Sequence, residues 1–276
     1  MSNIPNVVSI AGVDPSGGAG VLADIKSFTA QGTYGCGVIA ALTAQNTQGV
    51  TGVHVPPTDF LRLQIDTLFA DVPIHAVKLG MLGSAEIVST VAERLAHWRA
   101  PFVVCDPVMV AKSGDHLLAR SAVAMLIEAL LPQTFLITPN LPEAGVLLEA
   151  RAPETVKEMY RAAERLRDML PTQSERWVLL KGGHLPGNEI VDLLFDGDRM
   201  IEMPAPRIAT RNTHGTGCSL SSAIAALLPQ TTASPAPVEE AVRRATQWLR
   251  QAIARSGELA AGQGHGPVHH FHALWK

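Results

Sequence analysis

The residues best suited to chemistry form a polar, glycine-containing turn at 212–217, which runs into a small-residue segment expected to be helical from about Cys218. Gly215 and Gly217 remove side chains where the free backbone N–H groups of a helix start converge. Those N–H groups and the helix dipole favour binding of a phosphate or a developing oxyanion. Thr216 lies between the two glycines. The same positive end is expected to lower the pKa of the Cys218 thiol. The alternative is a glycine-rich turn that only caps a buried helix.

Two acidic residues and a lysine follow predicted strands and supply the other parts of a phosphoryl-transfer site. This reaction needs positioning and charge neutralisation more than covalent chemistry. Asp106 and Glu143 are the candidate Mg²⁺ residues, because Mg²⁺ takes few protein ligands and bridges phosphates. Lys181 is the candidate phosphate contact, although a lone lysine at a strand end is often only a solvated charge. The P-loop pattern G-x-x-x-x-G-K-[ST] is absent, so a P-loop kinase is excluded.

A cluster of amides and hydroxyls, Gln45, Asn46 and Thr47, ends the predicted strand 36–44. An amide both donates and accepts, so the cluster suits recognition of a nitrogen heterocycle, and equally a turn.

Residues 18–23 match the dinucleotide pattern G-x-G-x-x-A, but no acidic residue lies between Asp24 and Asp59 to bind a ribose. We therefore expect these glycines to let backbone approach a small ligand, with Asp14 and Asp24 as polar handles. Asp24 could instead be only a first-turn carboxylate that favours the helix start.

The histidine-rich tail at 262–272 has no cysteine or carboxylate close by in the sequence. It is interpreted as a structural or ligand-covering tail rather than a metal cluster.

The elements that must position these residues alternate between strands and helices. Strands are expected at 7–11, 36–44, 76–81, 102–105, 135–138 and 177–180, and helices at 22–30, 59–69, 84–99, 121–131, 154–170 and 239–255. Such alternation predicts a parallel sheet with helices on both faces, and ligands bind at the carboxyl ends of its strands. Segments 190–195 and 199–203 flank an Asp-Gly-Asp turn, which predicts a hairpin and an antiparallel edge. The absence of repeats and linkers predicts one α/β domain over residues 1–276. The glycine and the charged residues of segment 111–116 lead us to expect a lid there.

Composition narrows the function classes. The 276 residues are 47% hydrophobic and carry a net charge of −3 without basic blocks, which argues against nucleic-acid or membrane partners. No apolar stretch reaches membrane-spanning length, and the first residues do not look like a signal segment. Three widely spaced cysteines are typical of free thiols in a reducing cytoplasm. We therefore expect a cytoplasmic enzyme with a small-molecule substrate.

Taken together, the motifs resemble the hydroxymethylpyrimidine/phosphomethylpyrimidine kinases of thiamine biosynthesis, which belong to the ribokinase-like superfamily. The resemblance runs nearly end to end and rests on residues 11–20, 35–46, 78–82, 137–144, 181–184, 212–218 and 266–272. The chain differs from the family pattern in residues 20–24: a glutamine is expected there, and this chain has Leu22. The resemblance implies a three-layer α/β/α sandwich around a mostly parallel sheet, ATP and Mg²⁺ as cofactors, and a homodimer.

The resemblance also implies roles for individual residues. Gln45 would bind the aminopyrimidine, in a pocket shaped by Gly12, Asp24, Met81 and Val108. Gly215, Thr216 and Gly217 would form the anion hole, and Cys218 would stand where ribokinase relatives carry an aspartate base. Lys181, Asn140 and His214 would contact the nucleotide, and Asp106 and Glu143 the metal. The substrate alcohol would be phosphorylated first, and its monophosphate second.

Three other functions remain open at this stage. A pyridoxal or pyridoxine kinase would use the same scaffold on a similar heteroaromatic alcohol. A cysteine hydrolase could pair Cys218 with His214, although such partners usually come from distant segments. A non-catalytic ligand-binding protein would bind without turnover.

Overall fold

The computed structural model describes residues 4–109 and 119–275. Its centre is a nine-stranded sheet in the order β3-β2-β1-β4-β5-β6-β7-β8-β9. The strands are β1 Asn6–Val13, β2 Tyr34–Gln45, β3 Val50–His54, β4 Ala76–Leu79, β5 Val103–Cys105, β6 Leu136–Ile137, β7 Trp177–Leu180, β8 Glu189–Phe195 and β9 Met200–Pro206. The central strands from β2 to β7 are parallel. Their carboxyl ends therefore meet at one edge of the sheet.

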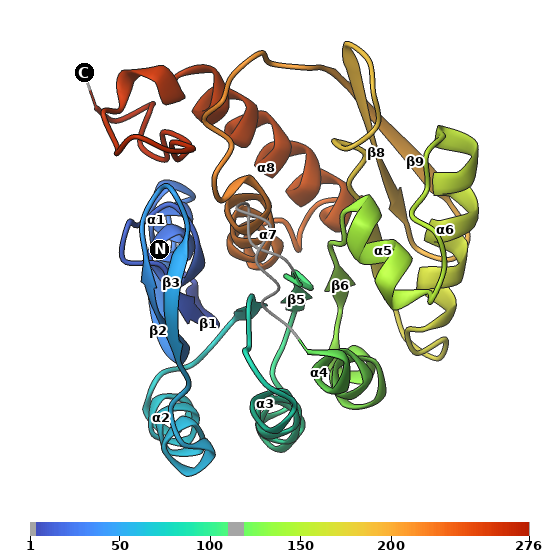
Figure 1. The fold of residues 1–276 in the computed structure, drawn as a ribbon. Coiled ribbons are helices and arrows are strands. Elements are labelled where there is room, and N and C mark those ends of the chain that lie inside the picture. The colour runs from blue at the N-terminus through green and yellow to red at the C-terminus, as the bar shows by residue number, and fades with distance from the viewer. Residues whose placement is uncertain (1–3, 110–118, 276) are drawn as a thin grey trace.

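Helices cover both faces of this sheet, as predicted. They are α1 Gly20–Ala30, α2 Thr58–Asp71, α3 Ala85–Trp98, α4 Arg120–Met125, α5 Leu141–Leu147, α6 Val156–Asp168, α7 Thr216–Leu227 and α8 Pro237–Ala254. Figure 1 shows α2, α3 and α4 on one side of the sheet and α7 and α8 on the other. Two apolar cores result, one under α2, α3, α5 and α6 and the other under α1, α7 and α8. This is the expected three-layer α/β/α sandwich.

The central strands form because they are short, apolar and rich in β-branched residues, so burial on both faces suits them. All four residues of β4 and all four of β7 are buried. Lys78 in β4 is the exception among these apolar strand residues, because its side chain is charged and yet 0% exposed. Such a charge requires a partner inside the protein.

Antiparallel pairing occurs at both edges of the sheet. The predicted hairpin is confirmed, because β8 pairs antiparallel with β9 and also with β7. At the other edge β3 pairs antiparallel with β2, with a register shift at Ala44/Gln45. The sequence pattern predicts only the edge at β8 and β9.

Two helix predictions need correction. The segment 121–131 is not one regular helix, because α4 continues as a π-helical turn at Leu126–Leu130 and a 3-10 turn at Leu131–Gln133. Helix α7 begins at Thr216, two residues before the predicted start, so Gly217 lies inside its first turn. The predicted lid at 111–116 lies outside the described residues. Within the parts of the chain that are described, no helix combines the length and apolar character needed to cross a membrane.

Candidate active site

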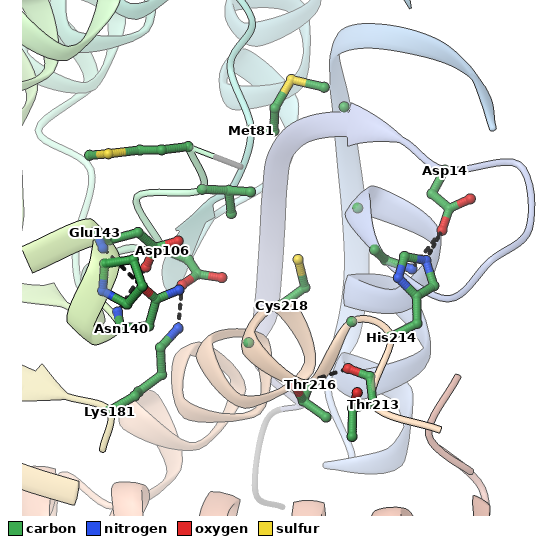
Figure 2. Close-up of a pocket in the computed structure, with 18 of the residues that line it drawn as sticks. Asp14, Met81, Asp106, Asn140, Glu143, Lys181, Thr213, His214, Thr216 and Cys218 are labelled. Carbon is green, nitrogen blue, oxygen red and sulfur yellow. Dashed lines mark hydrogen bonds and ion pairs between the residues drawn. The ribbon is translucent and has the colours of Figure 1, made fainter. Parts of the chain in front are cut away.

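A cavity of about 460 Å³ opens at the carboxyl ends of the central strands, against the start of α7. It has the size range and position expected of a ligand site in an α/β fold. Of the predicted site residues, Asp24, Asn46 and Thr47 do not line it. Asn46 and Thr47 instead accept hydrogen bonds from turn and tail backbone. The others do line it: Gly12, Asp14, Gln45, Met81, Asp106, Val108, Asn140, Glu143, Lys181, His214, Gly215, Thr216, Gly217 and Cys218. In Figure 2, Asp106, Asn140, Glu143 and Lys181 lie together on one side of the cavity, and Asp14 and His214 lie together on another.

The start of α7 is the glycine turn that the sequence predicts as an anion hole, and its backbone is called the candidate anion hole below. Gly215 is its N-cap in the left-handed region, at φ 73°. A Cβ at Gly215 would lie 1.7 Å from the carbonyl oxygen of Gly18, so only glycine fits both the backbone angle and this close approach. The first N–H groups of the helix have no partners within it. Outside the helix, the Thr216 N–H makes a long contact of 3.4 Å to Thr213 O. The turn therefore supplies backbone donors and a positive dipole end.

Lys181 and Asp106 lie directly beside this turn. Lys181 Nζ is 2.9 Å from Asp106 Oδ1, which also accepts a hydrogen bond from Thr138 at 3.1 Å. A Cβ at Gly217 would lie 3.1 Å from Lys181 Nζ and 3.5 Å from Asp106 Oδ2. The lysine therefore places a positive charge, and the aspartate a negative one, at the mouth of the candidate anion hole.

The charges in this cluster shift one another's proton affinities. Burial alone would raise the pKa of Asp106, but the ammonium groups of Lys181 and Lys78 hold it below its ordinary value. Burial would likewise lower the pKa of Lys181, and Asp106 and Glu143 raise it instead. Both groups are therefore charged at neutral pH and form an ion pair.

Glu143 and Asn140 form a capping box at the start of α5. The Asn140 backbone N–H donates to Glu143 Oε2 at 2.8 Å, and Glu143 N–H donates to Asn140 Oδ1 at 2.9 Å. Burial raises the pKa of Glu143 to about 7, against the lowering effect of Lys181. The capping box explains part of the position of Glu143 without any ligand. Glu143 nevertheless lies close to Asp106, so two carboxyl groups line the same part of the cavity.

His214 connects the turn of the candidate anion hole to the loop after β1. Its Nε2 lies 2.7 Å from Asp14 Oδ2, although the two residues are 200 positions apart. Burial would raise the pKa of Asp14, but hydrogen bonds from His214 and Ser16 hold it below its ordinary value. The backbone N–H of His214 also donates to Gly266 O, in the C-terminal tail. His214 lines the cavity, and these contacts make it a structural link as well.

The part of the cavity beside Met81 depends on a small residue. A Cβ at Gly12 would lie 2.8 Å from the terminal methyl carbon of Met81, and the Gly12 N–H donates to Met81 O at 2.9 Å. Gly12 therefore makes room for the Met81 side chain beside the cavity. Gln45 and Val108 line the same space.

Two predictions about this site need correction. Burial raises the pKa of the Cys218 thiol to about 11, against the lowering effect of Lys78, so the expected activated thiolate is wrong. Asp24 does not line the cavity; it is 0% exposed and accepts hydrogen bonds from Lys78, Ser9 and Ser222. Asp24 is thus the partner that the buried Lys78 requires.

Three further residues lie at the cavity although the sequence did not single them out as site residues. Thr43, Thr213 and His184 line it. Thr43 stands two positions before Gln45, and its Oγ1 lies 3.1 Å from Gln45 Oε1. Thr213 and His184 belong to motifs that were singled out, but nothing in their type distinguishes them from turn residues.

Comparisons with known proteins identify the family and the fold. A sequence model of the phosphomethylpyrimidine kinase family matches residues 14–269. The chain is 51% identical to the hydroxymethylpyrimidine/phosphomethylpyrimidine kinase of Escherichia coli (strain K12), over 98% of both chains. Among solved structures, a pyridoxal kinase of Bacillus subtilis in complex with ADP matches with a TM-score of 0.88 and 31% identity, over 99% of this chain and 100% of that one. A phosphomethylpyrimidine kinase of Clostridium difficile matches with a TM-score of 0.77 and 38% identity, over 91% and 100%.

Proposed function

The chain belongs to the phosphomethylpyrimidine kinase family, and from this premise we propose that it phosphorylates 4-amino-5-hydroxymethyl-2-methylpyrimidine and then the resulting monophosphate, with Mg²⁺–ATP as donor. This would be a cytoplasmic step of thiamine biosynthesis. The observation that carries the proposal is the juxtaposition of the Gly215–Gly217 backbone with the Lys181–Asp106 pair at one end of an otherwise largely apolar cavity.

In the first reaction the substrate hydroxyl oxygen forms a bond to the terminal phosphorus of ATP while the bond to the bridging oxygen of ADP breaks. Charge spreads over the three equatorial oxygens of the transferred group. The backbone N–H groups of Thr216 and Gly217 would bind these oxygens, and Lys181 would neutralise the oxygens on the ADP side. In the second reaction a phosphate oxygen of the monophosphate takes the place of the hydroxyl.

Asp106 and Glu143 have the donor chemistry that Mg²⁺ prefers. Among the described residues no group of three or more histidine, cysteine or acidic side chains is arranged to hold a metal. Two carboxylates fit an ion that keeps several waters and binds mainly to substrate phosphates. Such an ion would neutralise phosphate charge during transfer. Asn140, which also lines the cavity wall beside Lys181, would contact the nucleotide.

The protonation state of Cys218 decides whether this residue can accept the proton of the substrate hydroxyl. A thiol with a pKa of about 11 is protonated at neutral pH and has no free site for a proton. Because the transition state is loose, the hydroxyl needs little help from a base before its oxygen–phosphorus bond forms. We therefore assign most of the rate acceleration to the backbone N–H groups at the start of α7 and to Lys181, and the hydroxyl proton passes late to an oxygen of the transferred phosphoryl group rather than to Cys218.

The other functions fare differently. A pyridoxal kinase stays a second candidate, because structures of pyridoxal kinases are among the neighbours in fold. A cysteine hydrolase is disfavoured, since His214 directs Nε2 to Asp14 and the Cys218 thiol is protonated.

The homodimer that the resemblance implies is checked by sedimentation at micromolar concentration.

The proposal is tested by measuring ADP release from Mg²⁺–ATP with four acceptors offered separately: the pyrimidine alcohol, its monophosphate, pyridoxal and pyridoxine. Turnover on both pyrimidines is expected. The variant Lys181→Met should lower kcat/KM by about 100- to 1,000-fold, the range for loss of one group that stabilises transition-state charge. Lys157→Met, at an exposed position of α6, is the matched control. Turnover on pyridoxal alone would move the activity to that substrate, and no turnover on any acceptor would refute the kinase proposal.

A further inference from the structure

A glycine-rich part of the C-terminal tail contacts two segments that lead into the cavity. This tail segment, residues 262–267, has glycine at 262, 264 and 266. On one side it is bonded to the loop that follows Gln45, and on the other to the turn that precedes α7. The proposed reaction does not use any residue of this segment, although every second position in it is a glycine.

The first contact is with Thr47, two residues after Gln45. The backbone N–H of His265 donates to Thr47 O at 3.0 Å, and that of Gly264 donates to Thr47 Oγ1 at 3.1 Å. A Cβ at Gly264 would lie 1.9 Å from Thr47 O, and one at Gly262 would lie 2.3 Å from Thr47 Oγ1. The close approach of the tail to this loop therefore requires both glycines.

The second contact is with the turn that leads into the candidate anion hole. The His214 N–H donates to Gly266 O at 3.1 Å, and His214 and Pro267 form a parallel bridge. A Cβ at Gly266 would lie 2.5 Å from Asn212 Oδ1. The tail therefore binds the loop after β2 with residues 264 and 265, and the turn before α7 with residues 266 and 267.

We propose that the tail segment 262–267 is a positioning element that sets the distance between the loop after Gln45 and the candidate anion hole, with Gly264 as its critical residue. The inference rests on the proposed function, in which Gln45 holds the acceptor and the start of α7 holds the transferred group. Phosphoryl transfer requires the attacking and leaving oxygens to lie roughly in line. A misplacement of about 1 Å in such an arrangement can cost about 100-fold in rate.

The tail is anchored firmly enough to act as a spacer. His270 Nε2 lies 3.0 Å from Ser219 Oγ on α7, and the His269 N–H donates to Ala252 O on α8 at 2.9 Å. In contrast, residues 46 and 48 of the loop after β2 are exposed. An atom added between the tail and this loop should therefore move the loop, and with it the acceptor side of the site.

The test compares Gly264→Ala with Gly257→Ala. A Cβ at Gly257 meets no atom within 4 Å, whereas one at Gly264 overlaps the Thr47 carbonyl. Gly264→Ala should raise the KM for the pyrimidine alcohol and lower kcat, each by at least about tenfold. The KM for ATP should stay within about twofold, because the proposed nucleotide contacts Lys181 and Asn140 belong to other strand ends. Gly257→Ala should leave all three parameters within about twofold of the wild-type values.

Thr47→Val tests the same contact without adding volume. It keeps the shape of residue 47 and removes the oxygen that accepts the Gly264 N–H. The KM for the alcohol and kcat should change in the same directions as in Gly264→Ala, by about three- to tenfold, the range for one lost hydrogen bond. This variant decides the matter if melting temperatures show that Gly264→Ala fails to fold.

Wild-type kinetics in Gly264→Ala and Thr47→Val would overturn the inference. An equal rise of both KM values would overturn it as well, because that result indicates general damage to the site. Hydrogen exchange needs no turnover: Gly264→Ala should speed exchange of the amides in 46–49 by at least about tenfold and leave α8 unchanged. If the wild-type enzyme turns over no acceptor, the proposed function fails, and unchanged exchange in Gly264→Ala would then overturn the inference separately.

Discussion

At the scale of single residues, the site shows how burial can reverse an expectation drawn from sequence. The start of a helix favours a thiolate at Cys218, and Lys78 adds to that effect. Removal of the thiol from water nevertheless dominates and raises its pKa to about 11. The type and position of Cys218 were predictable from the glycine turn, but its proton affinity depends on Lys78, Asp106 and Asp24, which are distant in sequence.

Cys218→Ala should therefore lower kcat by no more than about tenfold, less than the 100- to 10,000-fold typical of a required general base. In the wild-type enzyme kcat should change by less than about threefold between pH 7 and 9. If Cys218 were the essential base, only about one molecule in 10,000 would carry the thiolate at pH 7, and kcat would rise about tenfold per pH unit. Steady-state kinetics of both proteins over this pH range decide the matter.

At the scale of elements, four segments around the candidate anion hole are joined by one buried cluster. Asp24 on α1 accepts from Lys78 on β4 at 2.9 and 3.0 Å, from Ser9 on β1 at 2.5 Å and from Ser222 on α7 at 2.6 Å. The cluster therefore fixes α7, which carries the candidate anion hole, relative to the sheet. Sequence reasoning could not find it, because Asp24 lies 54 positions from Lys78 and 198 from Ser222.

Lys78→Met should lower the free energy of unfolding by about 3–5 kcal/mol, because it leaves the Asp24 carboxylate buried without its countercharge. The double variant Asp24→Asn/Lys78→Met removes both charges and should recover at least about 1.5 kcal/mol of this loss. Denaturant unfolding of the three proteins measures both quantities. A cost below about 1 kcal/mol for the single variant would show that the pair does not hold these elements together.

The C-terminal tail docks against α7 through a buried histidine, which gives the tail the structural role that the sequence predicted. His270 Nε2 lies 3.0 Å from Ser219 Oγ, and burial lowers the pKa of His270 from 6.5 to about 3. Below about pH 6.5 the unfolded chain takes up a proton at this position that the folded chain does not bind. Stability is therefore lost as the pH falls through this range.

His270→Gln removes this linkage. Relative to the variant, the wild-type protein should lose about 2 kcal/mol of unfolding free energy between pH 7 and pH 5. His265→Gln changes an exposed histidine of the same tail and serves as the control. Thermal unfolding at both pH values gives the comparison. Parallel pH profiles of the wild-type protein and His270→Gln would contradict a buried neutral His270.

At the scale of the whole molecule, periodicity and chain order predicted the architecture well. Apolar runs such as Trp177–Leu180 are buried on both faces, and the alternation of strands and helices leaves few arrangements other than a parallel sheet. The edge strand β3 was missed as a paired strand because it is mostly exposed and lacks a clear pattern. Residues at strand ends, such as Asp106 and Gln45, were predictable because all these ends meet at one edge. Asp24 was misplaced because it follows the glycine loop and yet points into the interior.

The central claim is that one cavity carries out two successive phosphoryl transfers on one pyrimidine. The most direct test follows the pyrimidine alcohol and ADP together by mass spectrometry in a single reaction with excess Mg²⁺–ATP. The account predicts that the monophosphate accumulates and then declines, that the diphosphate is the final product, and that two ADP molecules form for each alcohol consumed. Lys181→Met should slow both steps alike. An end point of one ADP per alcohol, or loss of only one step in Lys181→Met, would contradict the claim.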